Sequence, residues 1–138
     1  MDPLNLSTAP PRTPHADVAG VIFLPRTIDK ARAMLPGGDI GEYTIPGLSE
    51  MMLERLGIPL DEFVAAVARA SSDEEVGAYV RAACSDEKIA AWNDWIRQRQ
   101  PRGGDREAAY ELYPWLRERP DLIIALDVLV EDDRRLFA

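Results

Sequence analysis

The sequence predicts an all-α fold, a single compact domain of about six or seven short helices. Apolar residues recur at helical spacing in several separate segments, and turn or cap residues bound most of these segments. No two segments show the alternation of apolar and polar residues that paired strands would need. At 138 residues, 46% of them hydrophobic, the chain is large enough for one domain with its own core.

The first predicted helix covers residues 24–35, and its apolar residues form one stripe. Pro25 suits the first turn, where its missing N–H would have no partner in any case, and glycines at 37 and 38 end the helix. A second helix is predicted over residues 48–56, ended by Gly57 and the proline that follows. The stripe of the first helix consists of Leu24, Ile28, Ala31 and Leu35.

Three acidic pairs mark the starts of three further helices. Asp61-Glu62, Asp73-Glu74 and Asp86-Glu87 each open an apolar segment of helical period, and acidic residues in a first turn complement the helix dipole. Ser72 and Ser85 stand where N-caps are expected, and Ser72 has the spacing of a capping box with the glutamate three residues later. We therefore expect three consecutive helices between residues 60 and 99.

The last third of the chain predicts a loop followed by two or three helices. Residues 100–104 form the best internal break, and Asp105 can cap a helix running to about Tyr113. Pro114 then kinks or restarts the helix. The apolar run at residues 122–130 fits either a helix or a buried strand, and we favour a helix because no partner strand is predicted.

The N-terminal residues 1–16 differ in composition from the rest. Four prolines stand among small polar residues, so we expect a flexible, disordered leader ahead of one helical domain over residues 17–138.

Composition excludes several classes of function. A net charge of −8 argues against binding to nucleic acid or to anionic membranes, since both require a basic surface. His15 is the only histidine and Cys84 the only cysteine, which removes histidine-based catalytic triads, Cys/His zinc sites and intrachain disulfides. We therefore expect no metal, no cofactor and no catalytic residue, and a cytoplasmic location.

The most informative candidate site is the polar side of the first helix. Arg26, Asp29 and Lys30 lie opposite the apolar stripe, and their spacing sets three ionisable groups side by side. Such a cluster could hold an anionic ligand, or it could be an ordinary solvated helix surface with weak ion pairs. Glu42 and Tyr43, in the next loop, could contribute a carboxylate and a phenol to the same site, although core packing of Tyr43 is the simpler interpretation.

A second candidate is an aromatic pair. Trp92 and Trp95 are three residues apart and share one side of a predicted helix. They could form an interface with a second copy of the chain or fill the core, and core filling is the simpler role for at least one of them.

Several of these motifs, in this order, resemble an uncharacterised bacterial family, the domain of unknown function DUF5069. The resemblance extends over roughly residues 10–130. It implies a compact helical domain and no particular activity, substrate or cofactor. Its motifs are Pro11-Arg12-Thr13-Pro14, Ala19-Gly20, Leu24-Pro25-Arg26-Thr27-Ile28-Asp29-Lys30-Ala31-Arg32-Ala33, Gly41-Glu42-Tyr43 and Ile89-Ala90-Ala91-Trp92-Asn93.

The leading functional hypothesis is a non-catalytic module that binds a small anionic molecule or a protein partner, with Arg26 and Lys30 as anion donors. One alternative is an enzyme that uses Asp29 or Glu42 as general base, with Lys30 and Arg26 stabilising an anionic substrate. Another is a homodimeric structural protein with a tryptophan-containing interface.

Overall fold

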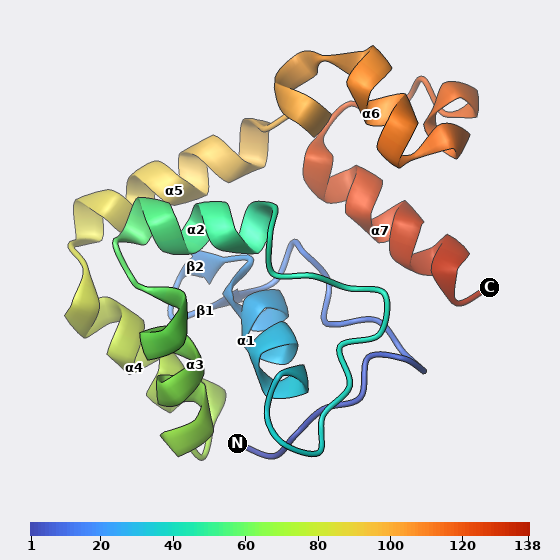
Figure 1. Ribbon diagram of the computed structural model, residues 1–138. Helices are drawn as coiled ribbons and strands as arrows, with labels where there is room; N and C mark the ends of the chain where they lie inside the picture. The colour runs from blue at the N-terminus through green and yellow to red at the C-terminus, as the bar shows by residue number, and fades with distance from the viewer.

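Seven α-helices dominate the structure, a computed structural model that describes all 138 residues (Figure 1). They confirm the all-α prediction. A two-stranded hairpin and two short 3-10 helices, η1 (Pro101–Gly104) and η2 (Pro114–Glu118), complete the regular elements. The helices are α1 (Leu24–Ala33), α2 (Leu48–Leu56), α3 (Leu60–Arg69), α4 (Asp73–Ala83), α5 (Asp86–Gln98), α6 (Arg106–Leu112) and α7 (Ala125–Leu136).

Helix α1 lies in the middle of the molecule, between the α2–α5 helices and α7 (Figure 1). Its apolar residues face the main core, as the stripe predicts, and Leu24 and Ile28 are fully buried there. Its polar side is covered as well, so nine of its ten residues are buried. The interpretation of this side as an ordinary solvated helix surface is therefore wrong, because other segments fold over it.

A tight hairpin precedes α1. Strands β1 (Asp17–Val18) and β2 (Val21–Ile22) pair antiparallel, and the two residues between them, Ala19 and Gly20, both have positive φ. Such a two-residue turn matches the twist of paired strands. Strands of two residues are too short to show alternation, which is why the sequence predicts no paired strands here.

The first sixteen residues are extended, but they are packed against the domain rather than disordered. Leu6 is buried, and its backbone N–H donates to the Asp39 carbonyl at 2.7 Å. The amino group of Met1 donates to the Val67 carbonyl at 3.0 Å. These partners are distant in sequence, so local composition could not reveal them, and the prediction of a flexible leader is not supported.

The three consecutive helices begin where their acidic pairs predict. Ser72 Oγ accepts from the Glu75 N–H at 3.3 Å, and Ser85 Oγ accepts from the Lys88 N–H at 3.2 Å. The reciprocal half of the capping box differs, because the Glu75 carboxylate accepts from the N–H of Ser71 instead. Both serines thus satisfy first-turn donors as expected.

The C-terminal part forms a smaller layer beside the main body, with α6 and η2 against α7 (Figure 1). Ala109, Leu116 and Val128 make its core. The apolar run at 122–130 is helical only from Ala125 onward, and α7 continues to residue 136. The Ala125 N–H donates to the Arg99 carbonyl at 2.7 Å, so tertiary contact delays the helix start. None of the helices combines the length and apolar character that crossing a bilayer requires.

Candidate functional site

A buried ion pair between Arg26 and Asp133 joins α1 to α7. Arg26 Nη1 and Nη2 donate to the two carboxylate oxygens of Asp133 at 2.7 and 2.9 Å, and Arg26 is only 2% exposed. The Tyr43 hydroxyl donates to Asp133 Oδ1 at 2.8 Å, and its ring centre lies 5.4 Å from Arg26 Cζ. Burial, followed by the hydrogen bond to Asp133, raises the pKa of Tyr43 above its usual value. The pair is bidentate and water-excluded, so its groups are held in one geometry.

One donor of this centre is unused. Arg26 Nε is buried and has no hydrogen-bond partner in the protein. A buried donor without a partner costs about 1–3 kcal/mol. This atom is therefore a natural place for a further acceptor to bind.

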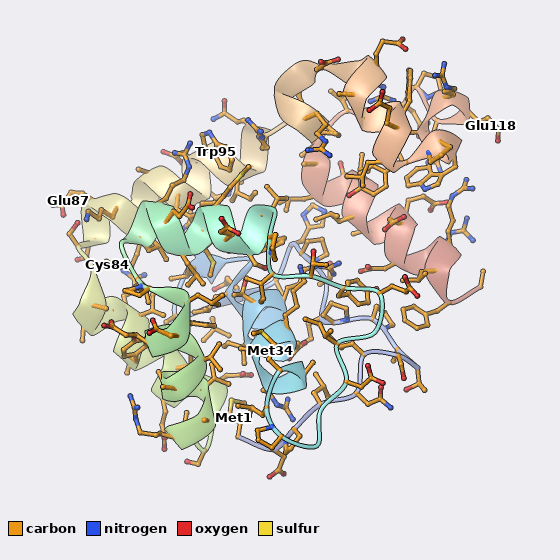
Figure 2. The ribbon with its side chains drawn as sticks, in the orientation of Figure 1. Met1, Met34, Cys84, Glu87, Trp95 and Glu118 are labelled. Atoms are coloured by element: carbon orange, nitrogen blue, oxygen red, sulfur yellow. The ribbon has the colours of Figure 1, made fainter.

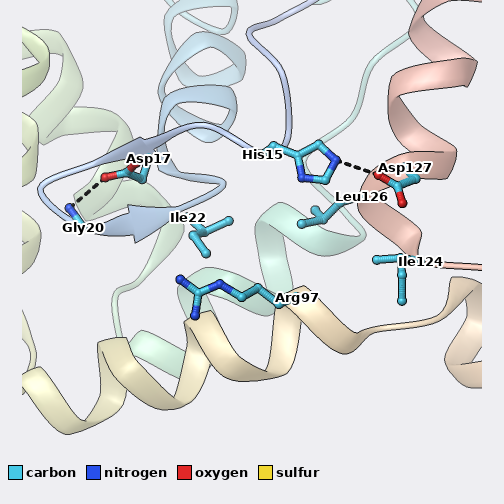
Figure 3. Close-up of a pocket in the computed structure, with 8 residues that line it drawn as sticks. All are labelled: His15, Asp17, Gly20, Ile22, Arg97, Ile124, Leu126 and Asp127. Atoms are coloured by element: carbon cyan, nitrogen blue, oxygen red, sulfur yellow. Dashed lines mark hydrogen bonds and ion pairs between the residues drawn. The ribbon is translucent and has the colours of Figure 1, made fainter.

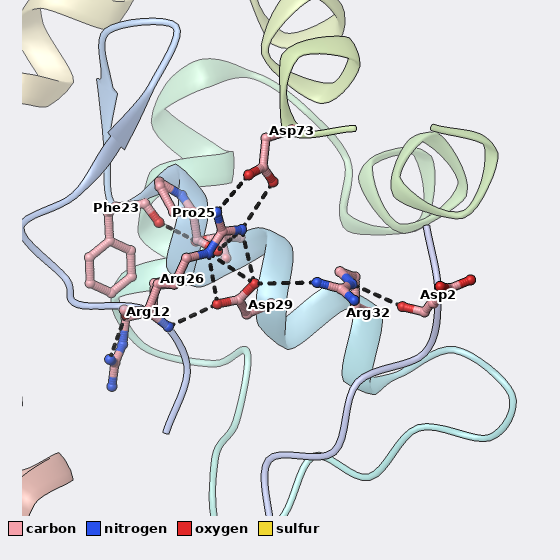
Figure 4. A network of polar contacts seen from close by, with 9 residues as sticks. Asp2, Arg12, Phe23, Pro25, Arg26, Asp29, Arg32 and Asp73 are labelled. Carbon is pink, nitrogen blue, oxygen red and sulfur yellow. Dashed lines mark hydrogen bonds and ion pairs between the residues drawn. The ribbon is translucent and has the colours of Figure 1, made fainter. Parts of the chain in front are cut away.

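A second ionic cluster holds the N-terminal segment on the same polar side of α1 (Figure 4), and the Arg12 carbonyl, which accepts from Arg26 Nη1 at 3.2 Å, joins it to the first. Asp29 accepts from Arg12 through the backbone N–H at 2.8 Å and through Nε and Nη2 at 3.1 and 3.0 Å. Arg12 also donates to both carboxylate oxygens of Asp73, at 2.6 and 3.0 Å. The hydrogen bond from Arg12 lowers the pKa of Asp73 below its usual range. This cluster closes the N-terminal segment over α1.

Lys30, one helical turn after Arg26, is a buried cation without an anion. It is 8% exposed, and no carboxylate forms an ion pair with it. Its Nζ donates to Ser49 Oγ at 3.4 Å and lies 5.7 Å from the centre of the Phe23 ring. The hydroxyl oxygen of Thr27 lies 3.1 Å from Ser49 Oγ. Lys30 thus contacts one hydroxyl, that of Ser49, and one aromatic ring.

The Lys30 amine is correspondingly easy to deprotonate. Burial, and after it the positive charge of Arg26, lower the pKa of Lys30 from 10.5 to about 7, with Asp133 opposing the change. About half of the Lys30 side chains are therefore neutral at neutral pH. A buried amine of this kind can either gain an anion or act as a free amine.

The structure thus brings four of the five predicted ligand residues around α1 and leaves one out. Arg26, Lys30 and Tyr43 lie about the Asp133 centre, and Asp29 lies in the cluster closed by Arg12. Glu42 is exposed, because its neighbour Tyr43 is the residue that turns inward. Asp29 is engaged by three donors of Arg12, and Glu42 is exposed, so neither of the two carboxylates named as a possible general base is buried and without a partner.

Sequence reasoning missed the partners that complete these clusters. Arg12, Ser49 and Asp133 lie 14, 23 and 107 positions from Arg26 along the chain, in the expected leader, in the second predicted helix and beyond the last predicted helix. Only the family motif at residues 11–14 included one of them. No local pattern could have paired them with α1.

His15 is also placed differently from expectation (Figure 3). Its Nε2 lies 2.9 Å from Asp127 Oδ1, in a pocket of about 570 Å³ that Asp17 and Arg97 also line. His15 and Asp127 are both about half exposed. No hydroxyl or thiol lines this pocket, so the pair has no side-chain nucleophile to activate.

The two candidate tryptophans have different environments. Trp92 is 1% exposed, and its Nε1 donates to the Ile22 carbonyl at 2.8 Å, so it belongs to the core and not to a surface interface. Trp95, labelled in Figure 2, is half-buried beside Trp92 and stacks against Arg55 of α2, whose Cζ is 3.9 Å from the ring centre. An interface with a second copy therefore has only Trp95 of this pair available.

Together the fold and the clusters define a class: a small helical domain whose central helix carries buried, mostly paired charges. The chain belongs to the family described as domain of unknown function DUF5069, whose model matches residues 8–135. No curated protein is similar enough in sequence to be matched with it.

Proposed function

We propose that this domain is a non-catalytic module that binds a small anionic ligand beside α1, with Lys30 and Ser49 as its anion-contacting groups. The observation that carries the proposal is the contrast between two buried cations on one helix. Arg26 has a carboxylate of its own, and Lys30 has only a hydroxyl. A bound anion would supply the negatively charged partner that Lys30 lacks.

Arg26, which the sequence suggests as an anion donor together with Lys30, has a smaller role in this proposal. Its two Nη groups serve Asp133, and only the buried Nε remains free for a ligand. The Ser49 hydroxyl can rotate, so it can accept from the Lys30 ammonium or donate to an anion. The chemical class that fits is a small carboxylate or a similar oxyanion. We further infer that the protein works in the cytoplasm, which its single cysteine, Cys84, favours.

Binding should depend on pH in a defined direction. An anion favours the charged form of Lys30, so above a pKa of about 7 the protein must take up a proton in order to bind. The affinity should fall by about tenfold per pH unit above that value. Below it, the affinity should not depend on the charge of Lys30.

The test measures thermal stability at pH 6 in carbon dioxide-free buffer, with acetate, formate or inorganic phosphate replacing chloride at constant ionic strength. A probe at 100 times its Kd should stabilise the wild type by about 2.7 kcal/mol. The stabilisation should vanish in Lys30→Met. It should persist in Lys88→Met, the matched control, because Lys88 is the only other lysine and is exposed.

Equal shifts in the wild type and in Lys30→Met would remove Lys30 from the site. A wild type that responds to no probe at pH 6 would overturn the proposal for these small oxyanions.

A further inference from the structure

We propose that Lys30 is a carbamylation site, at which its side-chain amine captures dissolved carbon dioxide as a carbamate. The inference goes beyond the proposed binding function, because the anion is formed on the protein itself from an uncharged gas. It needs a neutral amine where bound anions need a charged one. The two proposals therefore make opposite predictions about pH.

The surroundings of the Lys30 amine are those that a lysine carbamate requires. The side chain is 8% exposed, and the centre of the Phe23 ring lies 5.7 Å from Nζ. Water and its protons, which return a carbamate to amine and carbon dioxide, have little access. Carbon dioxide is small and apolar enough to reach such a place without an open pocket.

Donors for the new carboxylate group are already present. The Ser49 hydroxyl lies 3.4 Å from Nζ and can donate to a carbamate oxygen. Arg26 lies one turn away on the same side of α1, and its buried Nε has no partner. In the carbamylated protein, Arg26 would serve two anions, with Nη1 and Nη2 on Asp133 and Nε on the carbamate.

The reaction balances without a metal ion or a redox partner. The lone pair of the neutral amine attacks the carbon of carbon dioxide, and an N–C bond forms as one C=O π bond becomes an oxyanion. The nitrogen then loses one proton, which passes to solvent. The product is the N-carboxylate of Lys30, one negative charge in place of a neutral amine.

The charged groups near Lys30 favour this step at neutral pH. Burial and Arg26 on α1 hold the pKa of the amine at about 7, and Asp133 on α7 acts in the opposite direction. An ordinary lysine, with a pKa near 10.5, is only about 0.1% neutral at pH 7.5. Lys30 would be mostly neutral there, so its reactive fraction is several hundred times larger.

The test equilibrates the protein of residues 1–138 with ¹³C-carbon dioxide at a fixed partial pressure and records ¹³C NMR spectra from pH 6.5 to 8.5. We expect a protein-bound carbamate carbon signal that grows with pH across this range. Alkylation with a trialkyloxonium salt, followed by peptide mass spectrometry, locates the trapped carbamate. It should lie on the peptide that carries Lys30 and not on Lys88 or on the amino group of Met1.

Variants sharpen the assignment. Lys30→Met should lose the signal, Lys88→Met should keep it, and Ser49→Ala should reduce its occupancy several-fold. A folded wild-type protein without a carbamate on Lys30, or a signal that survives in Lys30→Met, would overturn the inference. Anion-dependent stabilisation at pH 6 in carbon dioxide-free buffer is a separate readout, so either proposal can fail while the other stands.

Discussion

Arg26 and Lys30 are two buried cations one turn apart on the same helix, and the fold treats them differently. Arg26 receives a bidentate carboxylate from α7 together with the ring and hydroxyl of Tyr43. Lys30 only donates one long hydrogen bond, from Nζ to Ser49 Oγ at 3.4 Å. The chemistry of the two side chains explains the difference, because a guanidinium cannot give up its proton at accessible pH and an ammonium can.

The desolvation cost of burial is offset in different ways for these two side chains. For Arg26 the cost of desolvation must be offset by a partner, so the ion pair is structural. For Lys30 the same cost is relieved either by loss of the proton, which leaves a reactive neutral amine, or by a bound anion that pairs with the charged form. Function is therefore expected at the incompletely paired cation, although the sequence presents both as equivalent.

The largest expected effect on stability is that of removing Arg26, the cation that has a carboxylate partner. Arg26→Ala should reduce the free energy of unfolding by about 3–5 kcal/mol, because it leaves Asp133 buried without its cation. Urea unfolding measures the loss. A double variant, Arg26→Met with Asp133→Leu, should recover most of it, since no lone charge then remains. A loss below 1 kcal/mol in the single variant would mean that Asp133 is hydrated rather than buried.

Removing the Lys30 amine should instead increase the free energy of unfolding, by an amount that depends on pH. The folded-state pKa of about 7 lies below the usual 10.5, so between these values the unfolded chain binds more protons. Wild-type stability therefore gains up to about 1.4 kcal/mol per pH unit from this group between pH 7 and pH 10. Below pH 7 the Lys30 amine is protonated in both the folded and the unfolded chain, and the full free-energy cost of burying its charge is present.

Lys30→Met lacks this penalty at every pH. It should be more stable than the wild type below pH 7, and its advantage should shrink by about 2–3 kcal/mol between pH 7 and pH 9. Urea unfolding at a series of pH values measures this, with Lys88→Met as control. An advantage that stays constant with pH would show that the Lys30 amine titrates normally.

The cluster at Arg12 is an intermediate case, because its cation is 39% exposed while Asp29 is buried. Arg12→Met should cost about 1–2 kcal/mol at neutral pH, measured by urea unfolding. Arg12 lowers the pKa of Asp73, so this part of the stability is present above pH 4 and is lost as the pH falls through the lowered folded-state pKa. A penalty that does not shrink in acid would separate Arg12 from Asp73.

The smallest expected effect is that of Tyr43→Phe. It removes the hydroxyl that donates to Asp133 and keeps the ring that stacks on Phe137, so the cost should be about 1 kcal/mol. Ultraviolet titration gives a second readout. Burial and Asp133 raise the pKa of Tyr43, so the wild type should contain one more late-ionising phenol than the variant does. A variant that loses a phenol ionising at the usual pH near 10, rather than a late one, would place the Tyr43 hydroxyl in solvent.

Local signals predicted the helices well and the contacts between them poorly. Ser72, Ser85 and Asp105 cap their helices as expected, because a cap acts within three residues of its own position. The start of α7 was missed by three residues, since the backbone of Arg99 holds Ala125. Arg26, Lys30 and Tyr43 could be recognised as a candidate group from spacing, whereas Asp133 and Ser49 could not.

The sequence alone determined the helical class, the helix starts and the chemistry that α1 carries, because these depend on periodicity and on groups a few residues apart. Only the tertiary structure decided that the polar side of α1 is covered, that Asp133 neutralises Arg26 and that Lys30 has no carboxylate partner. The physical reason is that pairing and desolvation depend on distance in space, and the decisive partners come from segments that local sequence patterns cannot connect.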